Sequence, residues 1–380
     1  MLETFKNTLQ DCNINFLLGS GMSRPFLATL SNVETLLTDL DASTASTDIK
    51  AVVRASVYRK YFDSVIGHNI KILADEEACR ATLTAYLNFL RTLNAILLKR
   101  KGTILSKETN LFTTNIDIFL ERALEDLGVE FNDGFNGRFH PTFSISNYKK
   151  TRAIKSLHYD NIAELPVFNL VKLHGSLTWT KNKGQIGLSY DLRHVGNVAA
   201  KVMPADHCVE VSNDATLQNL LDAAKEMAPT PEMSTFMNSY EQLLVMINPT
   251  KDKFRDTLIN QTYYELLRLF ANELEKENTV LFAMGFSFAD EHIREIVLRS
   301  ANSNPTLIVN IFAHSTAAGT EILSRFPAAE IRNNNIAVHA PTQSSEEGQP
   351  AKDLFQYDLS TINTRIFSAI LKEVAGDTAA

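Results

Sequence analysis

The chain has 380 residues, of which 44% are hydrophobic and 21% are charged, and its formal net charge is -7. This composition is typical of a globular chain long enough for two to three domains, and no apolar run approaches the roughly 18 residues that would span a bilayer. The acidic balance argues against direct nucleic-acid binding through the whole surface. The first residues lack the basic and apolar regions of a secretory signal, so we expect a cytoplasmic protein.

Seven mostly continuous apolar runs predict strands, and three amphipathic segments between them predict helices. The runs are residues 14–18, 110–115, 167–175, 243–248, 279–287, 306–314 and 335–340. The segments, with apolar residues at intervals of three and four, are residues 119–128, 254–277 and 289–302. Continuous apolar runs are typical of parallel strands that are covered on both faces. We therefore expect an α/β fold with a Rossmann-like doubly wound parallel sheet.

Two stretches interrupt this alternation. Residues 49–101 predict two long helices without a strand between them, so we expect a helical insertion module at 41–101. The apolar faces of these helices either pack on each other or contact another subunit. Residues 131–235 have weak periodicity, and the sequence assigns them no fold. The C-terminal part, 341–380, predicts an exposed loop followed by an amphipathic helix.

Small and polar residues follow four of the predicted strands. In chain order they are Gly19, Ser20 and Gly21; Asn115 and Asp117; His174; and Gly285, Ser287 and Asp290. Because ligands of open parallel sheets bind outside the carboxyl ends of the strands, we expect these segments to converge on one crevice. Taken singly, each also has a purely structural explanation: a tight turn, a helix cap or a hydrogen-bonded core histidine.

Four of these segments carry a family resemblance. In order, "GSGMS", "TTNID", "KLHG" and "GFS" resemble the sirtuin pattern of G-A-G-x-S, T-Q-N-I-D, a catalytic H-G and G-T-S. The resemblance implies an NAD-binding domain made of residues 1–40 and 102–340. It assigns Gly19, Ser20, Gly21 and Ser23 to the pyrophosphate, Gly285 and Ser287 to the adenosine side, Asn115 and Asp117 to the nicotinamide-ribose pocket, Asn310 to a ribose, and His174 to the role of general base.

The sequence also departs from the sirtuin deacylases. It has three widely spaced cysteines and no C-x-x-C pair, so the zinc ribbon of that family is missing, and Thr114 replaces the glutamine of the T-Q-N-I-D motif. The loop after the first glycines is shorter and lacks the family's aspartate. These differences argue against protein deacylation, but they leave the groups that bind and cleave NAD. The chain resembles the NAD-hydrolysing, sirtuin-like effectors of bacterial anti-phage defence. This implies a homo-oligomer, with a HerA-type motor ATPase as its partner.

The residue chemistry fits cleavage of the nicotinamide–ribose bond. The leaving group is already cationic, so the reaction needs a positioned nucleophile and no general acid. Asn115 can hold a ribose hydroxyl or water, and His174 can accept a proton. An NAD- or ADP-ribose-binding regulatory subunit without turnover is the alternative, and a deacylase is a third. Neither "DEHIREI" nor "HYDN" has the spacing of a helical metal site, so we expect no metal.

Overall fold

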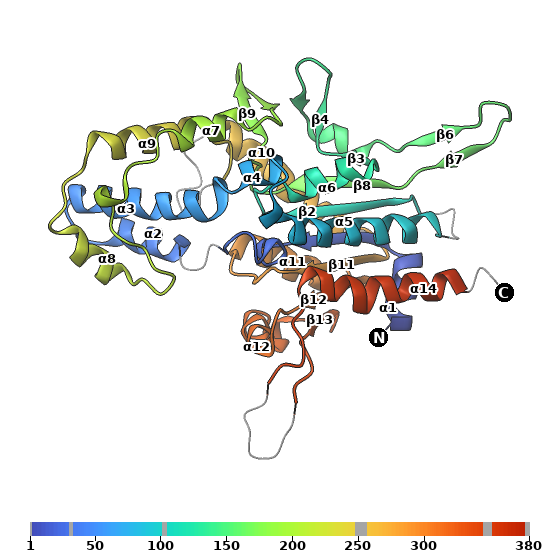
Figure 1. The fold of residues 1–380 in the computed structure, drawn as a ribbon. Coiled ribbons are helices and arrows are strands. Elements are labelled where there is room, and N and C mark those ends of the chain that lie inside the picture. The colour runs from blue at the N-terminus through green and yellow to red at the C-terminus, as the bar shows by residue number, and fades with distance from the viewer. Residues whose placement is uncertain (1, 30–32, 101–104, 248–256, 345–351, 377–380) are drawn as a thin grey trace.

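The computed structural model describes residues 2–29, 33–100, 105–247, 257–344 and 352–376 (Figure 1). Its centre is a seven-stranded sheet in the order β13-β12-β11-β1-β2-β8-β3, and every pairing in it is parallel. The strands are β1 (Asn13–Leu18), β2 (Glu108–Thr113), β3 (Glu130–Asn132), β8 (Val167–Lys172), β11 (Thr279–Met284), β12 (Leu307–Phe312) and β13 (Ile336–His339). The predicted fold class, a Rossmann-like doubly wound parallel sheet, is confirmed.

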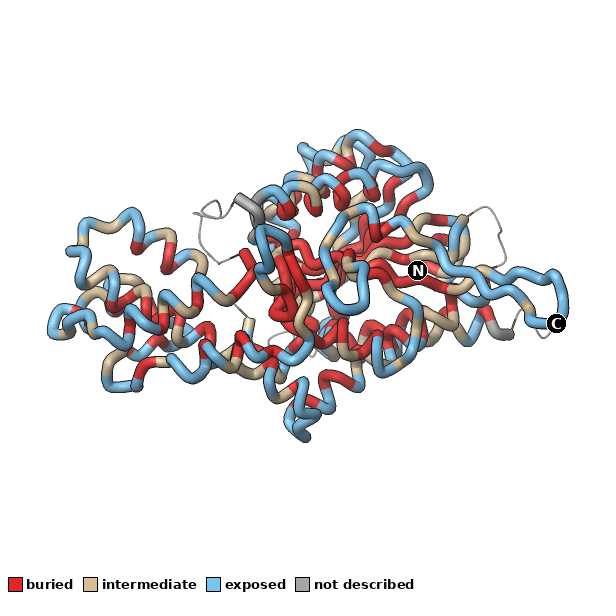
Figure 2. Tube along the Cα trace, turned by 90° about the horizontal axis from the view of Figure 1, so that it is seen from above, coloured by how far each residue is buried: buried red, intermediate tan, exposed pale blue. Residues whose placement is uncertain are grey.

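Helices cover both faces of the sheet, which is why its strands are continuously apolar. On one face Phe16 packs with Phe282 and with Phe89, and on the other face Phe112 packs with Phe270. The first face carries α1 (Leu2–Asp11), α5 (Glu77–Leu98), α6 (Phe119–Leu127), α13 (Leu359–Ile362) and α14 (Ser368–Gly376). The second face carries α10 (Thr257–Leu274), α11 (Glu291–Ser303) and α12 (Thr316–Arg325). Figure 2 shows the buried strands at the centre of the body.

The strand order reverses between β1 and β11. From β1 the chain adds β2 and then β8 on one side, and later it returns to add β11, β12 and β13 on the other. In open α/β sheets such a switch point leaves a crevice at the carboxyl ends of the two strands, because the following loops diverge to opposite faces. The loops after Leu18 and Met284 therefore mark the place where a ligand site is expected.

A separate helical lobe lies beside the sheet (Figure 1). It contains α2 (Val33–Ala42), α3 (Thr47–Tyr61), α7 (Arg193–Ala199), α8 (Leu217–Ala224) and α9 (Pro231–Leu243). Tyr58 of α3 packs edge-on against Tyr240 of α9, with ring centroids 4.9 Å apart. This lobe differs from the insertion expected at 41–101, because the second long helix, α5, packs on the sheet. Helices α7 and α8, from the unassigned stretch 131–235, belong to the lobe where α5 was expected.

The first long helix does not run straight into α5. It continues as a π-helical segment, Phe62–Ile66, and the short helix α4 (Asn69–Leu73) follows. At the C-terminus, the predicted closing helix contains a second π-helical segment, Asn363–Phe367, between α13 and α14. The expected loop at 341–352 lies largely outside the described residues, as does the start of the helix predicted at 254–277.

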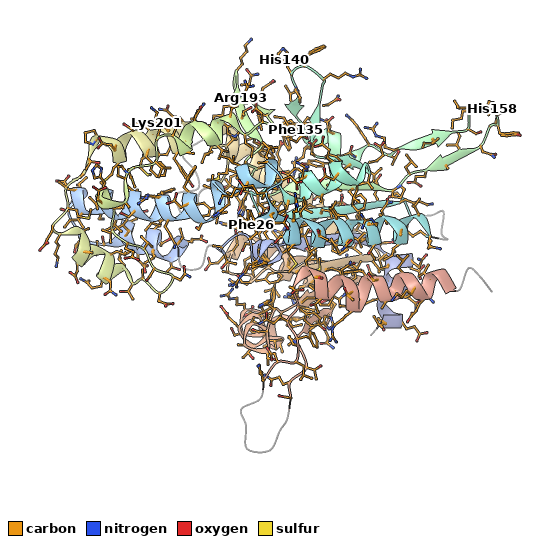
Figure 3. All side chains as sticks on the ribbon, in the orientation of Figure 1. Phe26, Phe135, His140, His158, Arg193 and Lys201 are labelled. Carbon is orange, nitrogen blue, oxygen red and sulfur yellow. The ribbon has the colours of Figure 1, made fainter. Side chains whose placement is uncertain are left out.

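Apart from β8, the strands between β3 and α7 form two small antiparallel sheets. One contains β4 (Phe135–Asn136), β5 (Thr142–Phe143), β10 (Gln185–Leu188) and β9 (Trp179–Asn182). The other is the β6–β7 arm, formed by β6 (Ala153–Lys155) and β7 (Ile162–Glu164), which extends away from the body with His158 near its tip (Figure 3).

The strand predicted at 243–248 is wrong. Helix α9 extends to Leu243, and within 244–247 the described chain makes only an isolated bridge between Met246 and Gly175. Val245, Met246 and Ile247 are buried, so their apolar character reflects burial of a crossing segment. In the described part of the chain, no helix is both long enough and apolar enough to cross a membrane.

Candidate functional site

Glycines at the switch point bring two loops into backbone contact. The amide of Gly19 donates to the carbonyl of Met284 (2.9 Å), and the amide of Gly21 donates to the carbonyl of Gly285 (3.0 Å). A Cβ added to Gly19 would lie 2.7 Å from Cα of Phe286, and one added to Gly21 would lie 2.9 Å from Cα of Gly285. Both distances are shorter than real Cβ contacts, so side chains are excluded here. The motif glycines are therefore needed for the approach of the β1 and β11 loops.

Ser23 lies at the end of the 3₁₀ turn Ser20–Ser23, and its hydroxyl is part of a buried network. It donates to Oδ2 of Asp117 (2.8 Å), and it lies 2.9 Å from the phenol oxygen of Tyr86 in α5. Burial, with the nearby Asp117 carboxylate, raises the pKa of Tyr86 well above its usual value, so the phenol stays protonated and donates to Ser23. Oδ1 of Asp117 accepts from the amide of Phe119 (3.1 Å) at the start of α6. This network fixes the β1 loop to α5 and to the β2 loop.

Asn115 connects the same two loops. Its Nδ2 donates to the carbonyl of Gly19 (3.1 Å) and lies 3.4 Å from Oγ of Ser23, while its own amide donates to Oγ1 of Thr113 (3.0 Å). The residue is 7% exposed. Its Oδ1 is buried and has no hydrogen-bond partner among the described residues. A buried acceptor without a partner is rare in folded proteins. The atom is enclosed by protein, so a hydroxyl or a water reaches it only when the surrounding loops shift.

His174 lies on the loop after β8 and reaches toward the loop after β11. Its Nε2 is 3.2 Å from Oδ2 of Asp290, and the two side chains are 16% and 10% exposed. The distance is that of an ion pair, but the orientation is not that of a hydrogen bond, and Nε2 has no hydrogen-bond partner within the described ranges. Asp290 also caps α11 through Oδ1, which accepts from the amides of His292 and Ile293. Because β2 and β1 lie between β8 and β11, this contact extends over the carboxyl ends of both.

A buried ion pair between Lys172 and Glu121 packs against these loops. Nζ of Lys172, the last residue of β8, lies 3.0 Å from Oε1 of Glu121 in α6, with side chains 4% and 7% exposed. Oγ of Ser176 donates to the same carboxylate oxygen (2.8 Å). Burial raises the pKa of Glu121, and the Lys172 ammonium partly offsets this effect. This pair was not predicted from the sequence, although a lysine inside a continuous apolar strand is a signal of a buried charge.

The remaining predicted site residues, Ser20, Ser287 and Asn310, do not take part in the contacts described above. Ser20 is half-buried in the 3₁₀ turn, and Ser287 is exposed, with its hydroxyl accepting from the amide of Ala289 (3.4 Å). Asn310 is buried two residues before the end of β12, where its Oδ1 lies 3.0 Å from Nε2 of His339. In the parts of the chain that the structure covers, no hydrogen bond connects Asn310 with Asn115 or His174.

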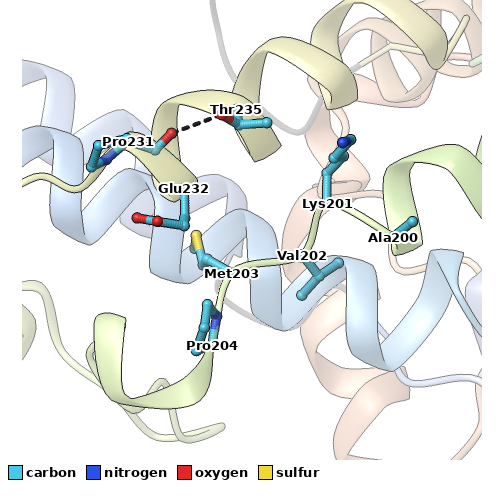
Figure 4. A pocket seen from close by; sticks show the side chains of 8 residues that line it. All are labelled: Ala200, Lys201, Val202, Met203, Pro204, Pro231, Glu232 and Thr235. Atoms are coloured by element: carbon cyan, nitrogen blue, oxygen red, sulfur yellow. Dashed lines mark hydrogen bonds between the residues drawn. The ribbon is translucent and has the colours of Figure 1, made fainter.

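A hollow of about 220 Å³ lies in the helical lobe, away from the strand ends (Figure 4). Residues 200–204, after α7, and Pro231, Glu232 and Thr235 of α9 line it.

Across the described ranges there is no group of three His, Cys, Asp or Glu side chains that could hold a metal ion. No family model matches the sequence, and a search of curated proteins finds no relative.

Proposed function

We propose that this chain is a sirtuin-like NAD glycohydrolase that releases nicotinamide and ADP-ribose. The observation that carries the proposal is the placement of two polar atoms: Oδ1 of Asn115, a buried acceptor without a hydrogen-bond partner among the described residues, and Nε2 of His174, which lies 3.2 Å from Oδ2 of Asp290. Each residue lies two positions beyond Thr113 and Lys172, which are register partners on adjacent strands. Two polar side chains thus end at neighbouring positions beside the switch point, where α/β sheets bind nucleotides.

The polar groups of Asn115 and His174 fit the chemistry of NAD cleavage. NAD enters as the substrate, and a water attacks C1′ of the ribose while the bond to the nicotinamide nitrogen breaks. Oδ1 of Asn115 accepts a hydrogen bond from a ribose hydroxyl or from the water. The water's proton passes to the imidazole of His174, which acts as the general base. Nicotinamide leaves as a neutral molecule, so the bond cleavage does not need an acid.

The network around Ser23 has a supporting role in this proposal. Ser23 and Asp117 satisfy each other and are almost fully buried, so they position Asn115 and the β1 loop. The amides of Gly19 and Gly21 already donate to the β11 loop, so half-buried Ser20 is the part of this turn left for a pyrophosphate. This assignment transfers part of the contact expected of Ser23 to Ser20.

The family resemblance also supports a cytoplasmic homo-oligomer that acts with a HerA-type motor ATPase as an anti-phage effector. The β6–β7 arm offers a surface for protein contacts, because four large apolar side chains are exposed on it: Ile154, Leu157, Tyr159 and Ile162. The alternative function, an NAD- or ADP-ribose-binding regulatory subunit, uses the same crevice but releases no nicotinamide.

Nicotinamide release from NAD by the purified chain, alone and with its partner ATPase, tests the proposal. We expect His174→Ala and Asn115→Ala each to lower turnover by about 10²-fold or more, because one removes the proton acceptor and the other misplaces the ribose or water. His140→Ala and Asn136→Ala, exposed on the β4–β5 hairpin, are the matched controls and should retain wild-type turnover. NAD binding without release by the wild type, in both conditions, would favour the regulatory subunit.

A further inference from the structure

The ammonium group of Lys172 holds the turn that carries Asn115. Its Nζ donates to the carbonyl of Asn115 (3.2 Å) and to the carbonyl of Asp117, and it lies 3.0 Å from Oε1 of Glu121. A protonated lysine has three N–H donors and no acceptor, so these three acceptors match the charged form. Lys172 is 3% exposed, and no water is needed to satisfy it.

The positive charge of Lys172 is neutralised by an adjacent carboxylate. The Glu121 carboxylate is the counter-ion, and it is itself fixed by the hydroxyl of Ser176. A buried ion pair adds little net stability compared with apolar residues of similar size, because both charges lose their hydration. Two apolar side chains would fill this site at least as well. A stability role alone therefore does not explain the pair, whereas the two carbonyl contacts do.

We propose that Lys172 is a positioning residue for NAD cleavage, an inference that rests on the proposed function. By fixing the carbonyls of Asn115 and Asp117, it sets the turn between β2 and α6 so that Nδ2 of Asn115 reaches the carbonyl of Gly19. This leaves Oδ1 of Asn115 free to accept from the substrate. Misplacing a positioning group by about 1 Å can cost about 10²-fold in rate.

The test separates positioning from stability with two variants of the full chain. Lys172→Met alone leaves the Glu121 carboxylate buried without its counter-ion, so we expect a lower melting temperature. Lys172→Met combined with Glu121→Leu removes both charges, so its melting temperature should recover toward that of the wild type. The carbonyls of Asn115 and Asp117 stay unheld in both variants. Hydrogen exchange of the amides at 114–118 should therefore be about 10-fold faster than in the wild type.

Steady-state kinetics complete the test. For the double variant we expect kcat for nicotinamide release to fall by about 10- to 100-fold, while KM changes by less than about 3-fold, since the crevice is otherwise unchanged. The matched control is the pair Lys276 and Glu273, at the opposite ends of the strands, where Glu273 also accepts from Asn110. Lys276→Met with Glu273→Leu should leave kcat and the exchange at 114–118 unchanged.

Two results would overturn the inference. A double variant with wild-type protection at 114–118 would show that Lys172 does not hold the turn. A double variant with faster exchange but wild-type kcat would show that the turn does not position the reaction. A wild-type chain that releases no nicotinamide, alone or with its partner, would instead refute the proposed function. The exchange rates alone would then decide whether Lys172 fixes the turn.

Discussion

Gly19→Ala tests the close contact at the switch point. The new Cβ would lie 2.7 Å from Cα of Phe286 and 2.8 Å from the carbonyl carbon of Gly285, so the β1 and β11 loops must separate by several tenths of an ångström. Main-chain atoms cannot rotate away as a side chain would. Such overpacking typically costs about 1–3 kcal/mol. We expect the variant to lose about 2 kcal/mol of unfolding free energy and to weaken the hydrogen bond from Gly21 to Gly285.

Urea denaturation followed by circular dichroism measures this change. The matched control is Gly196→Ala in α7, where an added Cβ has no heavy atom within 4 Å and φ is not positive. Alanine is the better helix former by about 1 kcal/mol, so the control should be as stable as the wild type or more so. If Gly19→Ala unfolds at the same urea concentration as the wild type, the two loops do not approach as described.

Two further predictions concern stability. Ser23→Ala removes the donor to Asp117 and the acceptor for Tyr86, so it should lower the unfolding free energy in urea by about 1–3 kcal/mol; an unchanged midpoint would contradict the network. Burial lowers the pKa of His339 and of His194, so as the pH falls through about 6.5 the unfolded chain binds these protons before the folded chain does, and stability is lost. His339→Asn should therefore lose less stability than the wild type between pH 7.5 and pH 5.5, and equal losses would contradict this origin.

The sheet could be predicted because its strands are covered on both faces. Burial on both faces selects continuous apolar runs, and six of the seven predicted runs are strands of the central sheet. The run at 243–248 shows the limit of that signal. Val245, Met246 and Ile247 are buried by a crossing segment, and a short apolar run does not reveal whether it pairs along a strand.

The contacts of the site residues could be predicted only in part. The motif spacing placed Asn115 and His174 at strand ends. A helix cap was only the structural alternative for Asp290, which does cap α11. The partners Tyr86 and Glu121 come from helices whose packing no local pattern encodes. The helical lobe could not be predicted for the same reason, because it is formed by two segments that lie far apart in the sequence. Tertiary packing decided whether a long helix such as α5 joined the sheet or the lobe.

Release of nicotinamide from NAD by the full chain, compared with His174→Ala, tests the central claim most directly. The assay should be run on the chain alone and with the proposed partner ATPase, as two separate conditions. We predict nicotinamide and ADP-ribose in equal amounts from the wild type and a loss of about 10²-fold or more in the variant, with the fold unchanged by circular dichroism. Equal nicotinamide release by the wild type and by folded His174→Ala would contradict the account.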